Sequence, residues 1–149
     1  MTEVTIDNLE NIPSNQLTAD EADKLEGSKP KIASVNTEEY DTRYGVDSKL
    51  ETYGNELPNG ETMKAWRVVA ETELFGEAVI GRNVTVKEYF NLKLSPSTGN
   101  WGPSLHEKSK AKQLFVKLSV KNFKEVPGNP ITILKKVGNN DRVFLTFGI

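Results

Sequence analysis

Residues 84–94 read VTVKEYFNLKL, in which apolar side chains alternate with lysine, ring and amide side chains. Successive side chains of a β-strand point to opposite faces, so a strand here would gather Lys87, Tyr89, Asn91 and Lys93 on one face. The other face would carry valine, phenylalanine and leucine and would pack into a core. This stretch therefore predicts a strand with one buried face and one face of rings and cations.

Two later stretches repeat the alternation: residues 114–121 read LFVKLSVK, and residues 142–147 read RVFLTF. If both form strands, their more polar faces would present Phe115, Lys117, Lys121, Arg142, Phe144 and Thr146. Flat rings among cations suit stacked bases and a phosphate backbone. The three stretches together predict a sheet surface that binds single-stranded nucleic acid.

The candidate binding residues are rings for base stacking and cations for phosphate contacts. The rings are Tyr89, Phe115, Phe144 and Trp101, and the cations are Lys87, Lys93, Lys117, Lys121 and Arg142. An alternative is that the face is covered, by the N-terminal segment, by the loop of residues 95–110 or by a partner subunit. Trp101 lies in this loop and is either folded back onto the core or presented to a ligand. Trp66, by contrast, is expected to pack in the core.

Charge is distributed unevenly along this chain of 149 residues, whose net charge is −2. Residues 1–29 carry 2 Lys or Arg against 7 Asp or Glu, a net of −5, whereas residues 104–149 carry 9 against 3, a net of +6. The overall acidity argues against a protein that coats DNA by charge alone. A basic C-terminal third is compatible with a local anionic partner, and equally with a solvated lysine-rich face.

The domain organisation predicted is a flexible acidic arm over residues 1–29, followed by a β domain over residues 30–149. Residues 18–21 read TADE, a capping box that predicts a short helix, which would end at Gly27. Turn signals separate the expected strands at residues 31–35, 62–68, 83–94, 112–121, 131–137 and 142–147, with a further short helix at 70–75. Many short strands divided by turns predict a barrel or a sandwich.

A family resemblance rests on four segments: DTRYG at 41–45, WRV at 66–68, LFG at 74–76 and IGRNVTV at 80–86. As a set, over roughly residues 30–125, they resemble small OB-fold single-stranded-DNA-binding proteins of archaeal and phage type. The resemblance implies an OB-like small β-barrel with a curved face that binds single strands by stacking. This chain departs from that pattern in its long loop at 95–110 and in an extra C-terminal hairpin at 130–147.

Other chemistries have little support in the sequence. Cysteine is absent and His106 is the single histidine, so neither a zinc site nor a thiol nucleophile is expected. His106 is assigned to a surface loop, and no catalytic residues, metal site or cofactor are predicted. No long apolar run or signal peptide is recognised, so we expect a cytoplasmic protein, or one of the host cytoplasm if it is viral.

The function predicted is non-enzymatic binding of single-stranded nucleic acid, with DNA as the expected form, and self-association into a homo-oligomer is compatible with it. No membrane partner is expected. The alternative is a phage or virion structural or assembly module, in which the face of rings and cations forms a protein interface.

Overall fold

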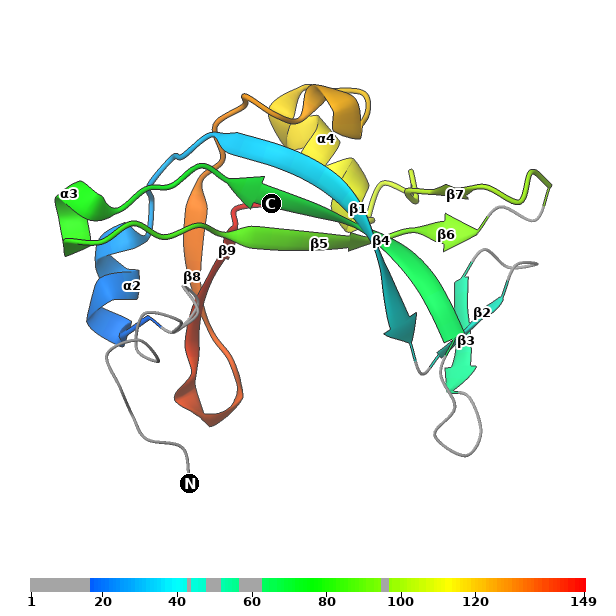
Figure 1. Ribbon diagram of the computed structural model, residues 1–149, viewed down its shortest axis with the longest axis horizontal. Coiled ribbons are helices and arrows are strands. Elements are labelled where there is room, and N and C mark those ends of the chain that lie inside the picture. The colour runs from blue at the N-terminus through cyan, green and yellow to red at the C-terminus, as the bar shows by residue number, and fades with distance from the viewer. Residues whose placement is uncertain (1–16, 43, 48–51, 57–62, 95–96) are drawn as a thin grey trace.

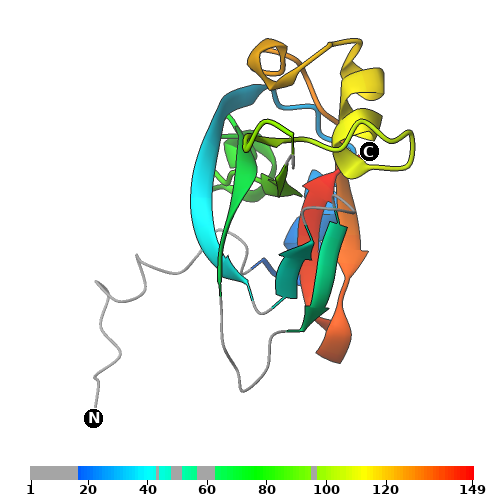
Figure 2. The ribbon, with the colours of Figure 1, turned by 90° about the vertical axis from the view of Figure 1, so that its right-hand side faces the viewer.

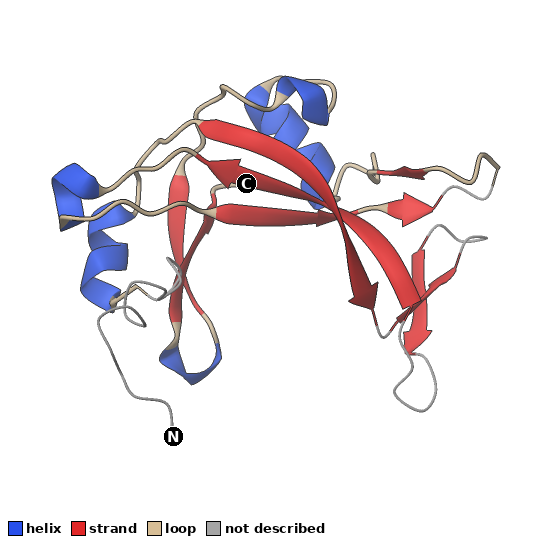
Figure 3. Cartoon of the chain, viewed as in Figure 1, coloured by secondary structure: helices blue, strands red, loops and turns tan. Residues whose placement is uncertain are grey.

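The computed structural model describes residues 17–42, 44–47, 52–56, 63–94 and 97–149. The described chain is mostly β, with helices at its margins (Figures 1 and 3). Its elements, in chain order, are α2 (Ala19–Leu25), β1 (Ile32–Thr42), β2 (Tyr44–Asp47), β3 (Thr52–Glu56), β4 (Met63–Thr72), α3 (Glu77–Ile80), β5 (Lys87–Asn91), β6 (Lys93–Leu94), β7 (Trp101–Gly102), α4 (Lys110–Leu118), η2 (Phe123–Glu125), β8 (Ile133–Val137), η3 (Asn139–Asp141) and β9 (Val143–Phe147).

The largest sheet has the strand order β1–β4–β5, and its strands are antiparallel. Alternation along β4 and β5 buries Val68, Ala70 and Phe90 on one face, whereas Arg67 and Tyr89 lie on the other. Figure 2 shows α4 and the β8–β9 hairpin on the same side of this sheet. The core forms between the sheet and these two elements.

Three phenylalanine rings join the layers of the core. Phe123 lies edge-on to Phe90 of β5, with ring centroids 5.4 Å apart, and edge-on to Phe115 of α4 at 4.9 Å. Edge-to-face geometry at these separations is favourable beyond the area that the rings bury. The 3₁₀ turn η2 therefore packs against both the helix α4 and the sheet.

Residues 110–118 form the helix α4, so the strand predicted at 112–121 is wrong. The Ser109 side chain caps the helix by accepting a hydrogen bond from the Lys112 backbone N–H at 3.1 Å. Ala111, Leu114 and Phe115 are buried at helical spacing, and Ser119 ends the helix in the left-handed conformation. Phe115 is only 2% exposed, so its predicted place on an open strand face is also wrong.

Two other expected elements differ from the structure. The short helix predicted at 70–75 is wrong for its first residues, because β4 continues to Thr72 and Ala70 pairs with Glu88 of β5. A helical turn does occur, but after Gly76, whose φ of 103° reverses the chain before α3. The predicted strand 83–94 is divided into β5 and β6, and β6 forms a small hairpin with β7 inside the expected loop.

The helix α2 is docked rather than carried on a separate arm. Its predicted capping box between Thr18 and Glu21 is confirmed, and Gly27 follows the helix with a φ of 87°. Ala22 and Leu25 are fully buried, and the Gly27 N–H donates to the Ile133 carbonyl at 2.8 Å. The expectation of a flexible arm therefore does not hold for residues 17–29, and its residues 1–16 lie outside the described residues.

An ion pair ties α2 to the chain just after α3. The Arg82 guanidinium donates to both carboxylate oxygens of Glu21, at 3.0 and 3.1 Å. This bond, followed by that from the Thr18 backbone N–H, lowers the pKa of Glu21 from 4.5 to about 2. The same contact raises the pKa of Arg82.

The four sheets remain separate among the described residues: β1–β4–β5, β2–β3, β6–β7 and β8–β9. Strands make up more of the described chain than helices do, so the prediction of a mostly β chain is confirmed. The predicted C-terminal strand pair and its turn at 138–141 are also confirmed. No described sheet closes into a barrel, so the OB-like barrel stays a prediction.

Candidate nucleic-acid interface

A groove of about 920 Å³ separates β5 from the tip of the β8–β9 hairpin. We call it the hairpin groove. Its lining residues are Leu17, Thr85, Val86, Lys87, Tyr89, Gly138, Asn139, Asn140, Arg142, Phe144 and Leu145. Four of the residues predicted from sequence therefore meet in one place, although they come from two segments more than fifty residues apart in the chain: Lys87, Tyr89, Arg142 and Phe144.

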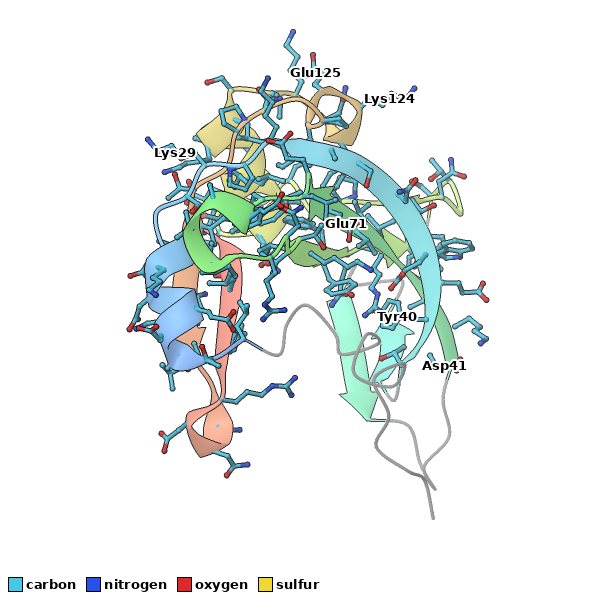
Figure 4. The ribbon with its side chains drawn as sticks, turned by 60° about the vertical axis from the view of Figure 1, so that its left-hand side comes forward. Lys29, Tyr40, Asp41, Glu71, Lys124 and Glu125 are labelled. Carbon is cyan, nitrogen blue, oxygen red and sulfur yellow. The ribbon has the colours of Figure 1, made fainter. Side chains whose placement is uncertain are left out.

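Tyr89 forms one bank of the hairpin groove and is 41% exposed. The Arg67 guanidinium carbon lies 4.4 Å from the centre of the Tyr89 ring and 4.7 Å from that of the Tyr40 ring. Arg67 is in turn paired with Glu38, its cross-strand neighbour on β1. Figure 4 shows Tyr40 on the inner side of the curve of β1. The Tyr89 ring is thus supported on one side by a fixed cation while much of it stays open.

Phe144 forms the opposite bank and is half-buried. It stands at the base of the turn closed by the Gly138 N–H, which donates to the Arg142 carbonyl at 2.7 Å. A Cβ atom on Gly138 would come within 3.2 Å of the Phe144 ring, so a larger residue would press on that ring. Thr146, expected on the same open face, is instead buried.

A second hollow of about 510 Å³ adjoins the first, and Tyr89 lines both. We call it the helix hollow, because it lies between β5 and the chain that enters α4. Its lining residues are Tyr89, Phe90, Asn91, Lys93, Ser104, His106, Lys108, Ser109, Lys110 and Ala111. The two hollows follow the same strand.

That strand, β5, is the edge strand of its sheet. The Leu92 N–H donates to Trp66 and the Thr72 N–H donates to Val86, so even-numbered residues of this segment face β4 with their backbone groups. The backbone groups of Lys87, Tyr89 and Asn91 then point toward the hollows. Lys110 covers part of this edge by donating to the Tyr89 carbonyl at 2.9 Å.

The lining of both hollows contains cations and, among the described residues, no aspartate or glutamate. Two of these cations have carboxylate partners just outside the lining: Lys87 with Glu71 at 3.8 Å, and Lys110 with Glu88 at 2.7 Å. The other three cations, which make no ion pair within the part of the chain described, are Lys93, Lys108 and Arg142. The hairpin groove and the helix hollow together, which we call the trough, are therefore locally basic in a chain with a net negative charge.

Other predicted site residues lie away from this trough. Phe115 belongs to the core, while Lys117 and Lys121 are exposed at the C-terminal end of α4 and beyond it, and line neither hollow. Trp101 is half-buried against the core, which is the folded-back alternative. Trp66 is 37% exposed and is not part of the core cluster, so its expected place in the core is wrong.

Some residues in or beside the trough are not assigned to the binding surface by the sequence, among them Arg67, Lys110 and His106. Arg67 follows Trp66 and lies on the same face as Tyr89, which alternation along β4 could have shown. Lys110 contacts the β5 edge only because α4 places it there. His106 lies in a loop, as expected, but no sequence pattern indicates that it lines a hollow.

The described residues offer no cluster of three or more metal-binding side chains, and none of their helices has the length and apolar character needed to cross a membrane. Comparisons with protein-family models, with curated proteins and with solved structures find no match to this chain. The geometry of the trough is therefore the basis for a functional proposal.

Proposed function

We propose that the hairpin groove binds single-stranded nucleic acid without chemical turnover, by stacking bases on Tyr89 and Phe144. The observation that carries the proposal is the lining of the groove, in which two rings, two cations and two amides meet and no described carboxylate intrudes. Stacking on aromatic side chains together with backbone contacts from cations is the usual way in which proteins bind single strands of varied sequence.

Both rings line the groove, and the Tyr89 ring is held by its contact with Arg67. The Phe144 ring lies close to Gly138, where the absence of a side chain leaves room for it. A ring that is already fixed loses little conformational freedom when a base stacks on it. Lys87 and Arg142 lie beside the two rings and would contact phosphates, while the amides of Asn139 and Asn140 can donate to and accept from base edges.

An OB-like arrangement of the five strands β1, β4, β5, β8 and β9 belongs to the same proposal. The start of β1 is joined by backbone bonds to the segment that leads into β8: Ile32 N–H to Asn129 at 2.9 Å, Gly128 N–H to Ile32 at 2.7 Å and Ile131 N–H to Pro30 at 2.9 Å. A closed barrel would also pair β5 with β9. The hairpin groove lies between β5 and β9 in place of that pairing, so the ligand would bind where the barrel stays open.

The direct test is a titration of the protein into a fluorescently labelled decathymidylate, followed by anisotropy, with a duplex of the same length as the comparison. We expect the single strand to bind more tightly than the duplex and its affinity to fall as salt rises. Removing both groove cations in Lys87→Ala/Arg142→Ala should reduce the slope of log affinity against log salt by about 1.4, since each phosphate contact on a single strand contributes about 0.7.

The matched control is Lys117→Ala/Lys121→Ala, which removes the same charge from exposed positions outside the groove. This control should leave the slope close to that of the wild type. Equal losses in the two double variants would mean that net charge alone governs binding. If the wild type does not bind the oligonucleotide at low salt, the proposal fails, and the alternative of a protein interface at this face takes its place.

A further inference from the structure

The helix hollow continues the hairpin groove along β5, and Tyr89 is the residue that the two share. From Lys87 to Lys93 the strand covers about 20 Å, at a rise of about 3.3 Å per residue. Cations occur at intervals over this whole length, at Lys87, then Lys110 and then Lys93. A ligand confined to the hairpin groove would use only one end of the trough.

The helix hollow has the side chains for a phosphate backbone rather than for another base. It presents Lys93 and Lys108, which make no ion pair within the described part of the chain, beside Lys110, whose charge is shared with Glu88. Of its two benzene-type rings, Tyr89 and Phe90, Phe90 is buried, and Tyr89 lies at the boundary with the groove. Neighbouring cations without carboxylates in the lining favour a chain of phosphates.

His106 contributes a donor to the same hollow. Its Nδ1 accepts a hydrogen bond from the Lys108 backbone N–H at 3.2 Å, within the loop that leads into α4. A neutral imidazole whose Nδ1 is an acceptor carries its proton on Nε2. That Nε2–H, with the lysine ammonium groups, can donate to phosphate oxygens.

We infer that the helix hollow is a second subsite of the same binding surface, which takes the phosphate backbone of a strand whose bases stack on Tyr89 and Phe144. This inference rests on the proposed function and extends it from a local base site to a path along β5. It implies a site longer than a trinucleotide, within the range of about 4–16 nucleotides known for single-strand-binding barrels.

The experiment compares trithymidylate with decathymidylate, both labelled, on the wild type and on Lys93→Ala/Lys108→Ala. The trinucleotide reaches the hairpin groove alone, whereas the decanucleotide reaches both subsites. For the variant we expect weaker binding of the decanucleotide and a salt slope lower by about 1.4, with unchanged binding of the trinucleotide. Lys117→Ala/Lys121→Ala is again the control for charge, and its circular dichroism and that of the variant should match the wild type.

The outcomes separate the two proposals. Decanucleotide binding by the Lys93→Ala/Lys108→Ala variant with the affinity and slope of the wild type would overturn the second subsite and leave the hairpin groove standing. Loss of trinucleotide binding in the same variant would also overturn it, because the two hollows would then act as one site. If neither oligonucleotide binds to the wild type, the proposed function itself fails.

Discussion

β5 and α4 both supply a phenylalanine to the core, and Phe123 lies edge-on to each ring. They differ in what they show to solvent. β5 has a second ring, Tyr89, directly beside its buried Phe90 and on the opposite face, whereas α4 buries its one ring and exposes Val116 and Lys117. A strand that covers a core with one face can thus present rings to solvent on its other face. A short amphipathic helix has a single apolar stripe, and α4 buries its ring in that stripe.

The largest expected effect tests this difference within α4. Phe115→Ala should lower the free energy of unfolding by about 3–5 kcal/mol, because it empties a buried site beside the Phe123 ring. Val116→Ala, at the next position but 67% exposed, should change it by less than about 0.5 kcal/mol. Urea denaturation of the two variants measures both values. A strand at 112–121 would give the reverse order, so a larger effect at Val116 would contradict the helix.

A second comparison concerns α2, which sequence reasoning placed on an arm. Leu25→Ala should destabilise the protein by about 2–5 kcal/mol, since this side chain is fully buried beside Gly76. Lys24→Ala, on the exposed side of the same helix, is the control and should have a small effect. Thermal unfolding followed by circular dichroism distinguishes the outcomes. A Leu25 variant as stable as the wild type would show that α2 is dispensable, as an arm would be.

The sequence predicts those parts of the fold whose partners are close along the chain. The capping box at Thr18 and the hairpin turn at 138–141 are local signals, and both are confirmed. The alternation in 84–94 correctly separates Tyr89 from Phe90. In 114–121 the same alternation is misleading, because Ala111, Leu114 and Phe115 also fit the helical spacing and Ser109 supplies a cap.

The candidate site could be predicted only in part, because it depends on contacts between distant segments. Lys87, Tyr89, Arg142 and Phe144 were recognised as surface rings and cations, but their meeting across one groove follows from how the hairpin docks. The roles of Arg67 and His106 depend on neighbours supplied by β1 and by the entry to α4. Side-chain alternation assigns a face and does not place two faces opposite each other.

A smaller effect is expected where α2 is held by charge. The pKa of Glu21 is about 2 in the folded protein, below its ordinary value of 4.5, so the stability from its pairing with Arg82 is present above about pH 4.5 and is lost as the pH falls toward 2. Glu21→Gln removes the charge and keeps a residue that suits the capping box. The variant should melt below the wild type at pH 6, and the difference should vanish near pH 2. A difference that is the same at both pH values would mean that the ion pair does not contribute.

The central claim is that the open ring of β5 binds nucleic acid while the buried ring beside it holds the fold. The most direct measurement is the dissociation constant of labelled decathymidylate for Tyr89→Ala, with Tyr89→Phe as the variant that keeps a ring. We predict that Tyr89→Ala weakens binding by about 1–3 kcal/mol, the cost of losing one stacked base, while Tyr89→Phe binds nearly as the wild type does and both variants stay folded. An unchanged dissociation constant for a folded Tyr89→Ala protein would contradict the account.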